Sequence, residues 1–401
     1  MRGTVRKRGN SWSFIVDLGE DSNGKRQQKW KGGFRTKKDA QAALTEILGQ
    51  VAAGSYVEPT KKTVAVFLRE WLPAIEGTVR PSTWRSYATN MERHVMPRLG
   101  QVALRQLSAP QLNAFYSELL ATGRCDGRGG LSARTVRYTH VILHRALRDA
   151  VRWGLLSRNP ADLADPPKQQ RPEVQVWTPA QLRLFLEHVG GDRLAGLWVL
   201  LATTGMRRGE ALGLRWRDVD FATSRVSISQ TLGSWGGQLV FAAPKTAKSR
   251  RSLTLDPVTL TVLRRHHRLQ LEERMRWGRT NDELDLVFAR EDGSPVRPDT
   301  VTRQFAELSK SAGLPKIRVH DLRHTYATIA LSSGAHAKVV AERLGHATIG
   351  ITLDTYSHVM PALEEQTATR IARLIVGEMP ERSPASRTEP FLGKTLVTGL
   401  N

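Results

Sequence analysis

The stretch HDLRHTYAT, residues 320–328, brings together three side chains that can carry positive charge. Read as a helix, it places His320, Arg323 and His324 on one face, because positions three and four apart are neighbours on a helix. The apolar residues that follow are typical of a helix that faces a core. Cations beside a core are costly unless an anion meets them. The stretch therefore predicts an anion-binding site.

Two further polar clusters precede this stretch. They are TTGMRRGEALGLRWRDVD at 203–220 and FAAPKTAKSRRSLTL at 241–255. Arg207 follows a glycine-containing turn and stands ahead of a predicted helix. A cation at a helix start opposes the helix dipole, so we expect Arg207 to have another task. Lys245 and Lys248 lie in a turn-rich segment between predicted strands.

A fourth cluster, ERLGHATIGITLDTYSH at 342–358, follows the HDLRH stretch. Gly345 is predicted to end a helix, and His346 follows it directly. Tyr356 lies ten residues beyond His346.

Arginine, lysine, histidine and tyrosine together suit phosphoryl transfer. Guanidinium groups bind phosphate oxygens in a bidentate manner and stabilise the charge of the transition state. Tyrosine can be a covalent nucleophile, but with a pKa of about 10 only about one in a thousand is ionised at neutral pH. Histidine can act as acid or base, and lysine can protonate a leaving oxygen. The residue types predict that the anion is a DNA phosphate.

Single residues of these clusters also admit other interpretations. Arg207 alone could be a surface helix residue, and Lys245 alone a solvated turn lysine. Histidines four positions apart also suit zinc, but Arg323 would repel a cation and no Glu follows His320, so we expect no metal and no cofactor. The rival nucleophiles are the other five tyrosines, Tyr56, Tyr87, Tyr116, Tyr138 and Tyr326. Tyr326 is nearest, and we expect the apolar face of its helix to bury it.

The clusters, in this order, resemble the tyrosine recombinase (phage integrase) family. Its arginine box resembles TGMRRGE, its second box resembles HDLRHTYAT and its end resembles LGHATIGITLDTYSH. The resemblance is strong over this catalytic block. Residues 63–168 resemble the family's core-type DNA-binding domain, and residues 1–56 resemble the arm-type DNA-binding domain of phage and transposon integrases.

The resemblance implies roles for the charged residues. Arg207 and Arg323 would clamp the non-bridging oxygens of the scissile phosphate. Lys245 would protonate the leaving 5′ oxygen, with Lys248 as the alternative in the same turn. Glu210 would hold the pocket together as a structural residue.

The resemblance also implies roles for the histidines and the tyrosine. His320 would act as acid or base on the nucleophile side, and His346 would hydrogen-bond the phosphate. Tyr356 would attack and form a 3′-phosphotyrosyl link. His324 would be a structural residue near the site.

The whole chain is strongly basic. It has 401 residues, with 60 Lys and Arg against 38 Asp and Glu, a net charge of +22 and a pI near 10.7. This excess favours a polyanionic partner, with nucleic acid ahead of an anionic membrane surface. The single cysteine, Cys125, excludes an intramolecular disulfide and a cysteine-rich zinc site.

No signal peptide or membrane span is expected. The most apolar stretch, LAGLWVLLATTGM at 194–206, is shorter than the roughly 20 residues that a spanning helix needs. We therefore expect a cytoplasmic protein without a membrane partner.

The chain is predicted to be multidomain. We expect a small α+β arm-type DNA-binding domain at 1–58 (a three-stranded sheet plus a helix), an all-α core-binding domain at 63–168 (a SAM-like helical bundle), a linker at 169–176, a mainly α catalytic domain with a small antiparallel sheet at 177–380 (the tyrosine recombinase fold), and a flexible tail at 381–401.

Two groups of cations are candidate DNA contacts. The predicted helix 132–154 has one arginine row, opposite its apolar face: Arg134, Arg137, Arg145, Arg148 and Arg152. A charged row is often only a solvated face, but almost no acid is interleaved here, so we interpret it as a phosphate contact. The first 38 residues have a net charge of +8, and their candidates are Lys7, Arg8, Lys29 and Lys31.

The resemblance, together with the basic charge, implies a site-specific integrase that inserts, and could excise, a mobile element. It also implies double-stranded DNA with core-type and arm-type sites as the partner, bound by a homotetramer. A directionality factor or a DNA-bending host protein would fit as a further partner. A type IB topoisomerase and a non-catalytic DNA-binding regulator remain alternatives.

A last expectation concerns assembly. The predicted helix at 361–379 has an apolar stripe of Leu363, Ile371, Leu374 and Ile375. We expect it to dock on a neighbouring protomer, and packing on its own domain is the alternative.

Overall fold

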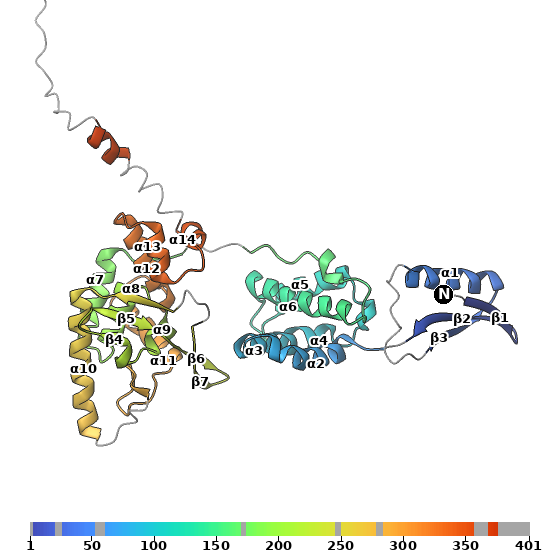
Figure 1. Cartoon of the computed structure of the whole chain (residues 1–401), viewed down its shortest axis with the longest axis horizontal. Helices are drawn as coiled ribbons and strands as arrows, with labels where there is room; N and C mark the ends of the chain where they lie inside the picture. The colour runs from blue at the N-terminus through green and yellow to red at the C-terminus, as the bar shows by residue number, and fades with distance from the viewer. Residues whose placement is uncertain are drawn as a thin grey trace, which may run out of the picture. The chain divides into compact units, whose positions relative to one another are not determined.

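The computed structural model describes residues 3–20, 26–52, 61–169, 174–244, 250–277, 284–356 and 368–375. The chain divides into two compact units, Met1–Pro172 and Glu173–Asn401 (Figure 1). Within the described residues, no helix is both long and apolar enough to cross a bilayer.

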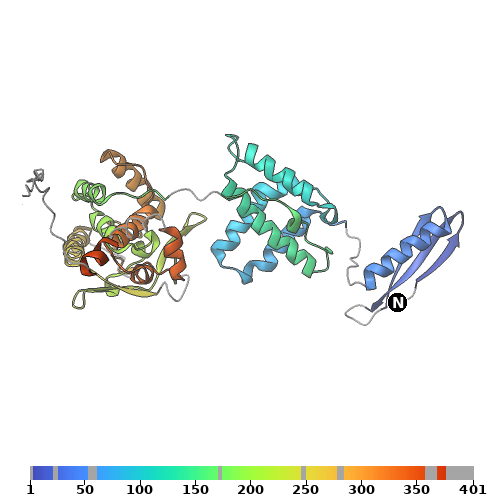
Figure 2. The same cartoon turned by 90° about the horizontal axis from the view of Figure 1, so that it is seen from above.

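The N-terminal module is a sheet covered by one helix (Figure 2). Strands β1 (Gly3–Arg8), β2 (Ser11–Glu20) and β3 (Arg26–Phe34) are antiparallel in the order β1-β2-β3. Helix α1 (Lys37–Ala52) begins after Thr36, whose hydroxyl oxygen accepts the backbone N–H of Asp39 at 3.1 Å. Phe14, Val16 and Leu44 form the buried contact between sheet and helix.

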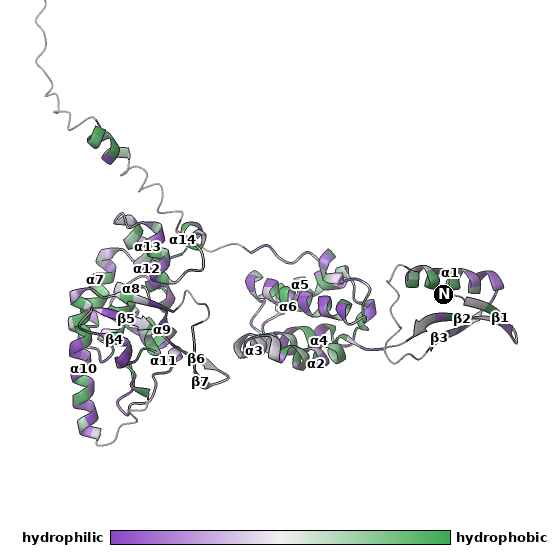
Figure 3. Ribbon diagram, in the orientation of Figure 1, coloured by the Kyte–Doolittle hydropathy of each residue, from purple (hydrophilic) through white to green (hydrophobic). Residues whose placement is uncertain are grey.

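A helical bundle follows in the same unit. Its helices are α2 (Val64–Ile75), α3 (Pro81–Asn90), α4 (Met96–Leu99), α5 (Ala109–Thr122) and α6 (Ala133–Arg152). A π-helical turn, η2 (Met91–Val95), joins α3 to α4, and the 3-10 turns are η1 (Glu76–Thr78), η3 (Leu104–Gln106) and η4 (Pro160–Leu163). Helices α5 and α6 carry both hydrophobic and hydrophilic residues (Figure 3). The predicted apolar face of α6 is confirmed, since Val136, Leu143, Leu147 and Ala150 are fully buried.

The second unit is mainly helical. Its helices are α7 (Pro179–His188), α8 (Ala195–Thr204), α9 (Arg208–Leu212), α10 (Pro257–Trp277), α11 (Pro298–Ser311), α12 (Val319–Ser332), α13 (Ala337–Leu344) and α14 (Ile349–Thr355), and residues 368–375 are also helical. A 3-10 turn, η5 (Trp216–Asp218), leads into strands β4 (Val219–Asp220), β5 (Arg225–Ile228), β6 (Thr231–Trp235), β7 (Gln238–Ala242) and β8 (Arg251–Thr254). The strands form two antiparallel sheets, β4-β5-β8 and β6-β7.

Helix α8 lies at the centre of this unit. Its sequence AGLWVLLATT is apolar on nearly every side, which is typical of a helix surrounded by other elements. Trp198 of α8 packs against Phe185 of α7 and Phe305 of α11, with ring centroids 6.1 and 5.7 Å away. The predicted fold class is confirmed: a sheet-plus-helix module, a helical bundle and a mainly α unit with small antiparallel sheets.

Candidate active site

The end of α8 positions the first arginine. Gly205 ends the helix in a left-handed conformation (φ 65°). A Cβ atom there would lie 2.6 Å from the Tyr326 ring and 2.7 Å from Leu344, so the close packing requires glycine. Arg207 then becomes the N-cap of α9, as the sequence predicts for a residue ahead of a helix.

A buried carboxylate holds Arg207. Glu210 is 4% exposed, and its Oε1 accepts Arg207 Nη1 at 2.7 Å while its Oε2 accepts the Arg207 backbone N–H at 3.0 Å. Arg251, the first residue of β8, donates Nη1 and Nη2 to the same carboxylate at 3.2 and 3.0 Å. Burial alone would raise the pKa of Glu210, but the hydrogen bonds and charges of Arg251 and Arg207 outweigh it and keep this pKa below its usual value.

The second arginine is more deeply buried. Arg323 of α12 is 3% exposed and donates Nη1 to the Gly205 carbonyl at 2.9 Å and Nη2 to the Leu344 carbonyl at 2.6 Å. Burial, followed by the charge of Arg207, lowers the pKa of Arg323 to about 9. Arg323 therefore stays protonated at neutral pH and would gain strongly from an anion.

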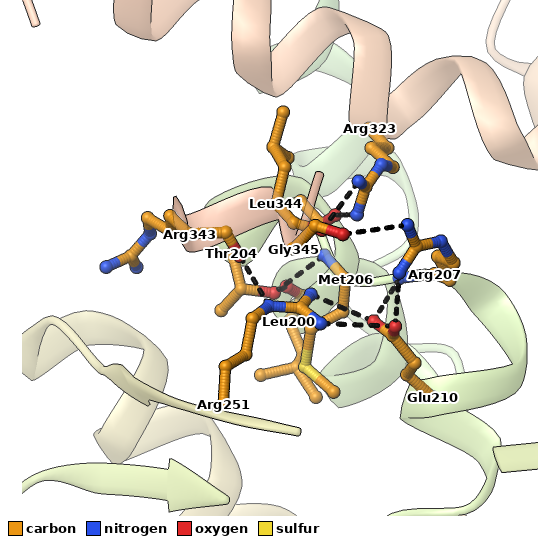
Figure 4. Close-up of polar contacts among 11 residues, drawn as sticks. Leu200, Thr204, Met206, Arg207, Glu210, Arg251, Arg323, Arg343, Leu344 and Gly345 are labelled. Atoms are coloured by element: carbon orange, nitrogen blue, oxygen red, sulfur yellow. Dashed lines mark hydrogen bonds and ion pairs between the residues drawn. The ribbon is translucent and has the colours of Figure 1, made fainter. Parts of the chain in front are cut away.

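The C-terminal end of α13 supplies acceptors for three arginines (Figure 4). The Arg343 carbonyl accepts Arg251 Nε at 2.6 Å, the Leu344 carbonyl accepts Arg323, and the Gly345 carbonyl accepts Arg207 Nη2 at 3.4 Å. Carbonyls at a helix C-terminus have no partner inside the helix and carry the negative end of its dipole, so they suit cations. We call these three oxygens, of residues 343–345, the carbonyl cradle.

The histidines lie beside the arginines. The rings of His320 and His324 on α12 are 5.2 Å apart, and His346 Nδ1 lies 2.7 Å from the Thr352 hydroxyl. Desolvation and then the charges of Arg323 and Arg207 lower the pKa of His346 to about 4. Desolvation and the charges of His324 and Arg323 also depress the pKa of His320, which remains exposed at the pocket. The imidazoles are therefore neutral at neutral pH.

Tyr356 lies just beyond α14 and is 1% exposed. Its hydroxyl is 2.8 Å from His324 Nδ1, and its ring packs with Ala327, Leu331 and Leu344. Burial raises the pKa of Tyr356 to about 12, although the charge of Arg323 acts in the opposite direction. The phenol is thus protonated and hydrogen-bonded to a histidine.

A pocket of about 500 Å³ collects most of these groups. Its lining includes Arg207, His320, Arg323, His324 and His346. Among the described residues Thr355 lines it and Tyr356 does not, so the hydroxyl lies behind His324. The pocket offers permanent cations and neutral imidazoles, an arrangement that suits a phosphodiester.

Six of the predicted site residues, Glu210 included, therefore line one pocket, and Tyr356 lies next to it. Lys245 and Lys248 lie outside the described residues. Sequence reasoning gave Arg251 no role, although its segment SRRSL stands in a predicted polar cluster. The described residues also contain no group of three His, Cys, Asp or Glu side chains arranged to hold a metal ion.

The arginine row of α6 is mostly solvent-facing. Arg134, Arg137, Arg148 and Arg152 are exposed. Arg145 is half-buried, with its guanidinium 5.7 Å from the centre of the Tyr87 ring. A pocket of about 560 Å³ beside the row is lined by Arg134, Arg137 and Tyr138 among others.

The four cations predicted in the N-terminal module do not share one face. Lys7 pairs with Trp12, Lys31 with Phe14 and Lys29 with Val16, so these lysines belong to the sheet face that α1 covers. Arg8 belongs to the open face. There its guanidinium lies 5.7 Å from the centre of the Trp30 ring, and Trp30 is 54% exposed.

The described part of the predicted C-terminal helix is exposed. In residues 368–375, Ile371 is 49% exposed and Leu374 and Ile375 are each 78% exposed. Leu363 lies outside the described residues.

Comparisons with known proteins agree with this geometry. Residues 178–362 match the phage integrase family, 4–51 match an arm DNA-binding domain, and 63–120 match the N-terminal SAM-like domain of phage integrases. The chain therefore belongs to the phage integrase family of tyrosine recombinases, a family of site-specific DNA recombinases.

The curated relatives span nearly the whole chain. A XerC-like tyrosine recombinase of Caldanaerobacter subterraneus is 27% identical over 87% of this chain and 93% of its own length. An integrase of Streptomyces ambofaciens is 28% identical over 88% and 91%, respectively.

Solved structures share the fold. The Tn1549 transposon integrase in complex with circular intermediate DNA has a TM-score of 0.63 at 22% identity, over 76% of this chain and 99% of that one. A lambda integrase tetramer bound to a Holliday junction has a TM-score of 0.54 at 15% identity, over 88% and 95%.

Proposed function

We propose that this protein is an integrase that cuts and rejoins double-stranded DNA through a 3′-phosphotyrosyl intermediate, and so inserts and excises a mobile element. The observation that carries the proposal is the pocket, where Arg207, Arg323 and His346 converge on a space next to the buried hydroxyl of Tyr356. Two protonated arginines held at the wall of one pocket are suited to stabilise the extra negative charge of a phosphoryl-transfer transition state.

In the first step the Tyr356 oxygen attacks the scissile phosphorus. A bond forms between phosphorus and the phenolic oxygen, the bond to the 5′ oxygen breaks, and the departing oxygen takes a proton from Lys245 or Lys248. Arg207 and Arg323 neutralise the non-bridging oxygens, and His346 donates a hydrogen bond. In the second step the 5′ hydroxyl of another strand attacks the link and releases Tyr356, so the phosphodiester energy is conserved.

The phenolic proton needs an acceptor. With a pKa of about 12, only about one Tyr356 hydroxyl in a hundred thousand is ionised at neutral pH. The hydrogen bond to His324 supports this histidine as the first acceptor, and the His320 ring beside it supports a path to the pocket. Because Tyr356 is not part of the pocket lining, the attack also requires the hydroxyl to move toward the phosphate.

Surfaces outside the pocket support the DNA partner. The exposed arginines of α6 would follow the phosphates of a core-type site. The open face of the N-terminal sheet, with Arg6, Arg8 and the exposed Trp30, supports contact with an arm-type site. Binding should weaken steeply as salt concentration rises, because phosphate contacts release counterions.

Four protomers would act on two duplexes. The exposed stripe of Ile371, Leu374 and Ile375 supports docking of the C-terminal helix on a neighbouring protomer. Truncation after residue 360 should then abolish synapsis of two DNA sites while leaving binding to a single site intact. Unchanged synapsis in a gel-shift assay would refute this docking.

A covalent trap tests the proposal. The purified chain is mixed with DNA flanking its own gene, in EDTA and without ATP, and quenched with detergent. We expect a protein–DNA band that disappears in Tyr356→Phe and persists in Tyr326→Phe, the matched control on α12. A band that survives Tyr356→Phe would refute the nucleophile, and relaxed plasmid without recombinant product would instead favour a topoisomerase.

A further inference from the structure

Arg251 commits every nitrogen of its guanidinium to the site. Nε donates to the Arg343 carbonyl at 2.6 Å, Nη1 to Glu210 Oε1 at 3.2 Å and Nη2 to Glu210 Oε2 at 3.0 Å. Its side chain is 8% exposed. A residue so buried, and so close to Arg207, can set the geometry of the pocket without touching the substrate.

Arg251 fills the remaining hydrogen-bond acceptor positions of the Glu210 carboxylate. Each oxygen of this carboxylate accepts two hydrogen bonds, one from Arg207 and one from Arg251. A carboxylate has about four acceptor positions, so none is left over. Glu210 therefore cannot rotate without losing a bond, and its Oε1 fixes the position of Arg207 Nη1.

Arg251 also balances charge. Glu210 is 4% exposed, and with Arg207 as its only cation it would hold that guanidinium as a closed ion pair. Arg251 supplies a second, buried positive charge to the same carboxylate. Two cations and one anion leave one net positive charge, and Arg207, at 37% exposed, is the member that can present it to the pocket.

The carbonyl cradle ties Arg251 to both clamp residues. Consecutive carbonyls of residues 343–345 accept Arg251, Arg323 and Arg207 in turn (Figure 4). The spacing of the guanidinium groups is therefore set by one short stretch of backbone. Arg251 and Arg207 also share the carboxylate of Glu210, and Arg251 does not line the pocket.

We propose that Arg251 is a positioning residue for phosphoryl transfer, which orients Arg207 toward the phosphate through Glu210 and the carbonyl cradle. The inference rests on the proposed function for the identity of the reaction. It predicts that charge alone cannot replace Arg251, because the three N–H groups of a lysine diverge from one nitrogen and cannot span the three acceptors that the planar guanidinium reaches.

A second arginine provides a matched control. Arg193 also donates Nε and Nη2 to one carboxylate, that of Glu273, at 2.8 and 2.6 Å, and Nη1 to a carbonyl, that of Ala289, at 2.7 Å. It does not line the pocket of the candidate site. Arg193→Lys should therefore reproduce any general loss of stability that Arg251→Lys causes.

The first readout needs neither DNA nor turnover. Binding of inorganic phosphate to the full chain is measured from the rise of the melting temperature with phosphate concentration, at constant ionic strength. We expect Arg251→Lys to weaken phosphate binding about tenfold and Arg193→Lys to leave it unchanged. In an Arg207→Lys background, Arg251→Lys should weaken phosphate binding by a further factor of less than about two, because Arg251 acts through Arg207.

Glu210→Gln separates positioning from simple electrostatics. This variant keeps the shape of the side chain and removes a negative charge, so a purely electrostatic role predicts tighter phosphate binding. Positioning predicts weaker binding, since the amide cannot accept all four hydrogen bonds. Four outcomes would each overturn the inference. Arg251→Lys could bind phosphate as tightly as the wild type, or could weaken binding by the full tenfold even in the Arg207→Lys background. Glu210→Gln could bind phosphate more tightly, or the wild type could fail to bind phosphate.

The rate of covalent linkage to DNA is the second readout. At saturating DNA we expect Arg251→Lys to lower the single-turnover rate by about 30-fold to 100-fold, which is no more than the lower end of the range for loss of one preorganised donor, because Arg251 acts through Arg207. If the phosphate results hold and the wild type never links to DNA, the proposed function fails while the positioning role stands. If linkage occurs and Arg251→Lys does not slow it, the positioning role fails alone.

Discussion

The two sides of the pocket are built in opposite ways. On the arginine side, Arg207 and Arg323 are held by a buried carboxylate and by backbone carbonyls within 2.6 to 3.4 Å. On the tyrosine side, Tyr356 follows a helix of only seven residues, and its hydroxyl is hydrogen-bonded to the His324 ring. The two arginines line the pocket, whereas Tyr356, the proposed nucleophile, lies outside its lining.

The difference follows from the chemistry of the two groups. Both arginines are charged at neutral pH, so fixed hydrogen bonds must hold them in place before the phosphate arrives, or they would pair with other acceptors. A tyrosine is useful only when it loses its proton, and burial with a pKa of about 12 prevents that loss until the surroundings change. In the proposed mechanism the arginines are therefore preorganised, and the ionisation of Tyr356 is the step that can be controlled.

The strongest challenge to this comparison is Arg323→Ala. It removes a clamp residue that is 3% exposed and leaves the carbonyls of Gly205 and Leu344 without that donor. We expect single-turnover linkage to DNA to fall by about a thousandfold. A loss below about tenfold would mean that the arginine side does not carry the stabilisation of the transition state.

Gly345→Ala disturbs the arginine side without removing a charge. Gly345 has φ 68°, where an alanine is strained by roughly 1 kcal/mol, so the cradle should shift. We expect about a tenfold slower linkage and a melting temperature lower by a few degrees. Gly334→Ala is the control, because Gly334 has φ 85° at the end of α12 and open space around it. Gly334→Ala should lower the melting temperature by a similar amount and leave the rate of linkage to DNA unchanged. An equal loss of rate in both variants would contradict a special role for the carbonyl cradle.

His324→Leu tests the tyrosine side. Without the imidazole, proton removal depends on solvent, and the ionised fraction of Tyr356 grows tenfold per pH unit below a pKa of about 12. We expect linkage to fall several-fold near neutral pH and the deficit to shrink as pH rises from 7 to 8, where Arg323 remains protonated. His188→Leu, which removes a hydrogen bond to the Ser311 hydroxyl (2.8 Å), should change neither rate nor pH profile. A constant deficit at every pH would exclude His324 as proton acceptor.

The smallest expected effect is on stability. The folded protein lowers the pKa values of His320, His324 and His346, by desolvation first, so the unfolded chain binds protons more readily. Their contribution is present above about pH 6.5 and is lost as pH falls toward the His346 value of about 4. We expect the melting temperature to drop by a few degrees between pH 7.5 and pH 5. His346→Gln should reduce that drop, and a drop of the same size would contradict the assignment.

Much of the site was accessible from the sequence. The motifs around Arg207, Arg323, His346 and Tyr356 predict one anion-binding pocket, and the structure brings these segments together. The arrangement of the first module also follows from residue patterns, and even the separation of Lys7 from Arg8 could have been predicted, because side chains alternate along a strand.

The remaining features depend on long-range packing. Arg251 meets Glu210 and the Arg343 carbonyl across 41 and 92 positions of sequence, and no local pattern encodes such contacts. The burial of Tyr356 behind His324 depends on how α14 packs against α12 and α13. The cradle itself is invisible in a sequence because its acceptors are backbone atoms.

That last property bears on how the protein tolerates change. Every residue has a carbonyl, so exchanging the side chain of Arg343 or Leu344 does not delete an acceptor from the cradle. The positions of the three carbonyl oxygens change only when the path of the chain changes, through an insertion, a deletion or a side chain at Gly345. The spacing of the guanidinium groups thus depends on the number of residues in α13 and on one glycine. Most point mutations should leave this spacing unchanged, whereas insertion or deletion of a single residue in α13 should disrupt it.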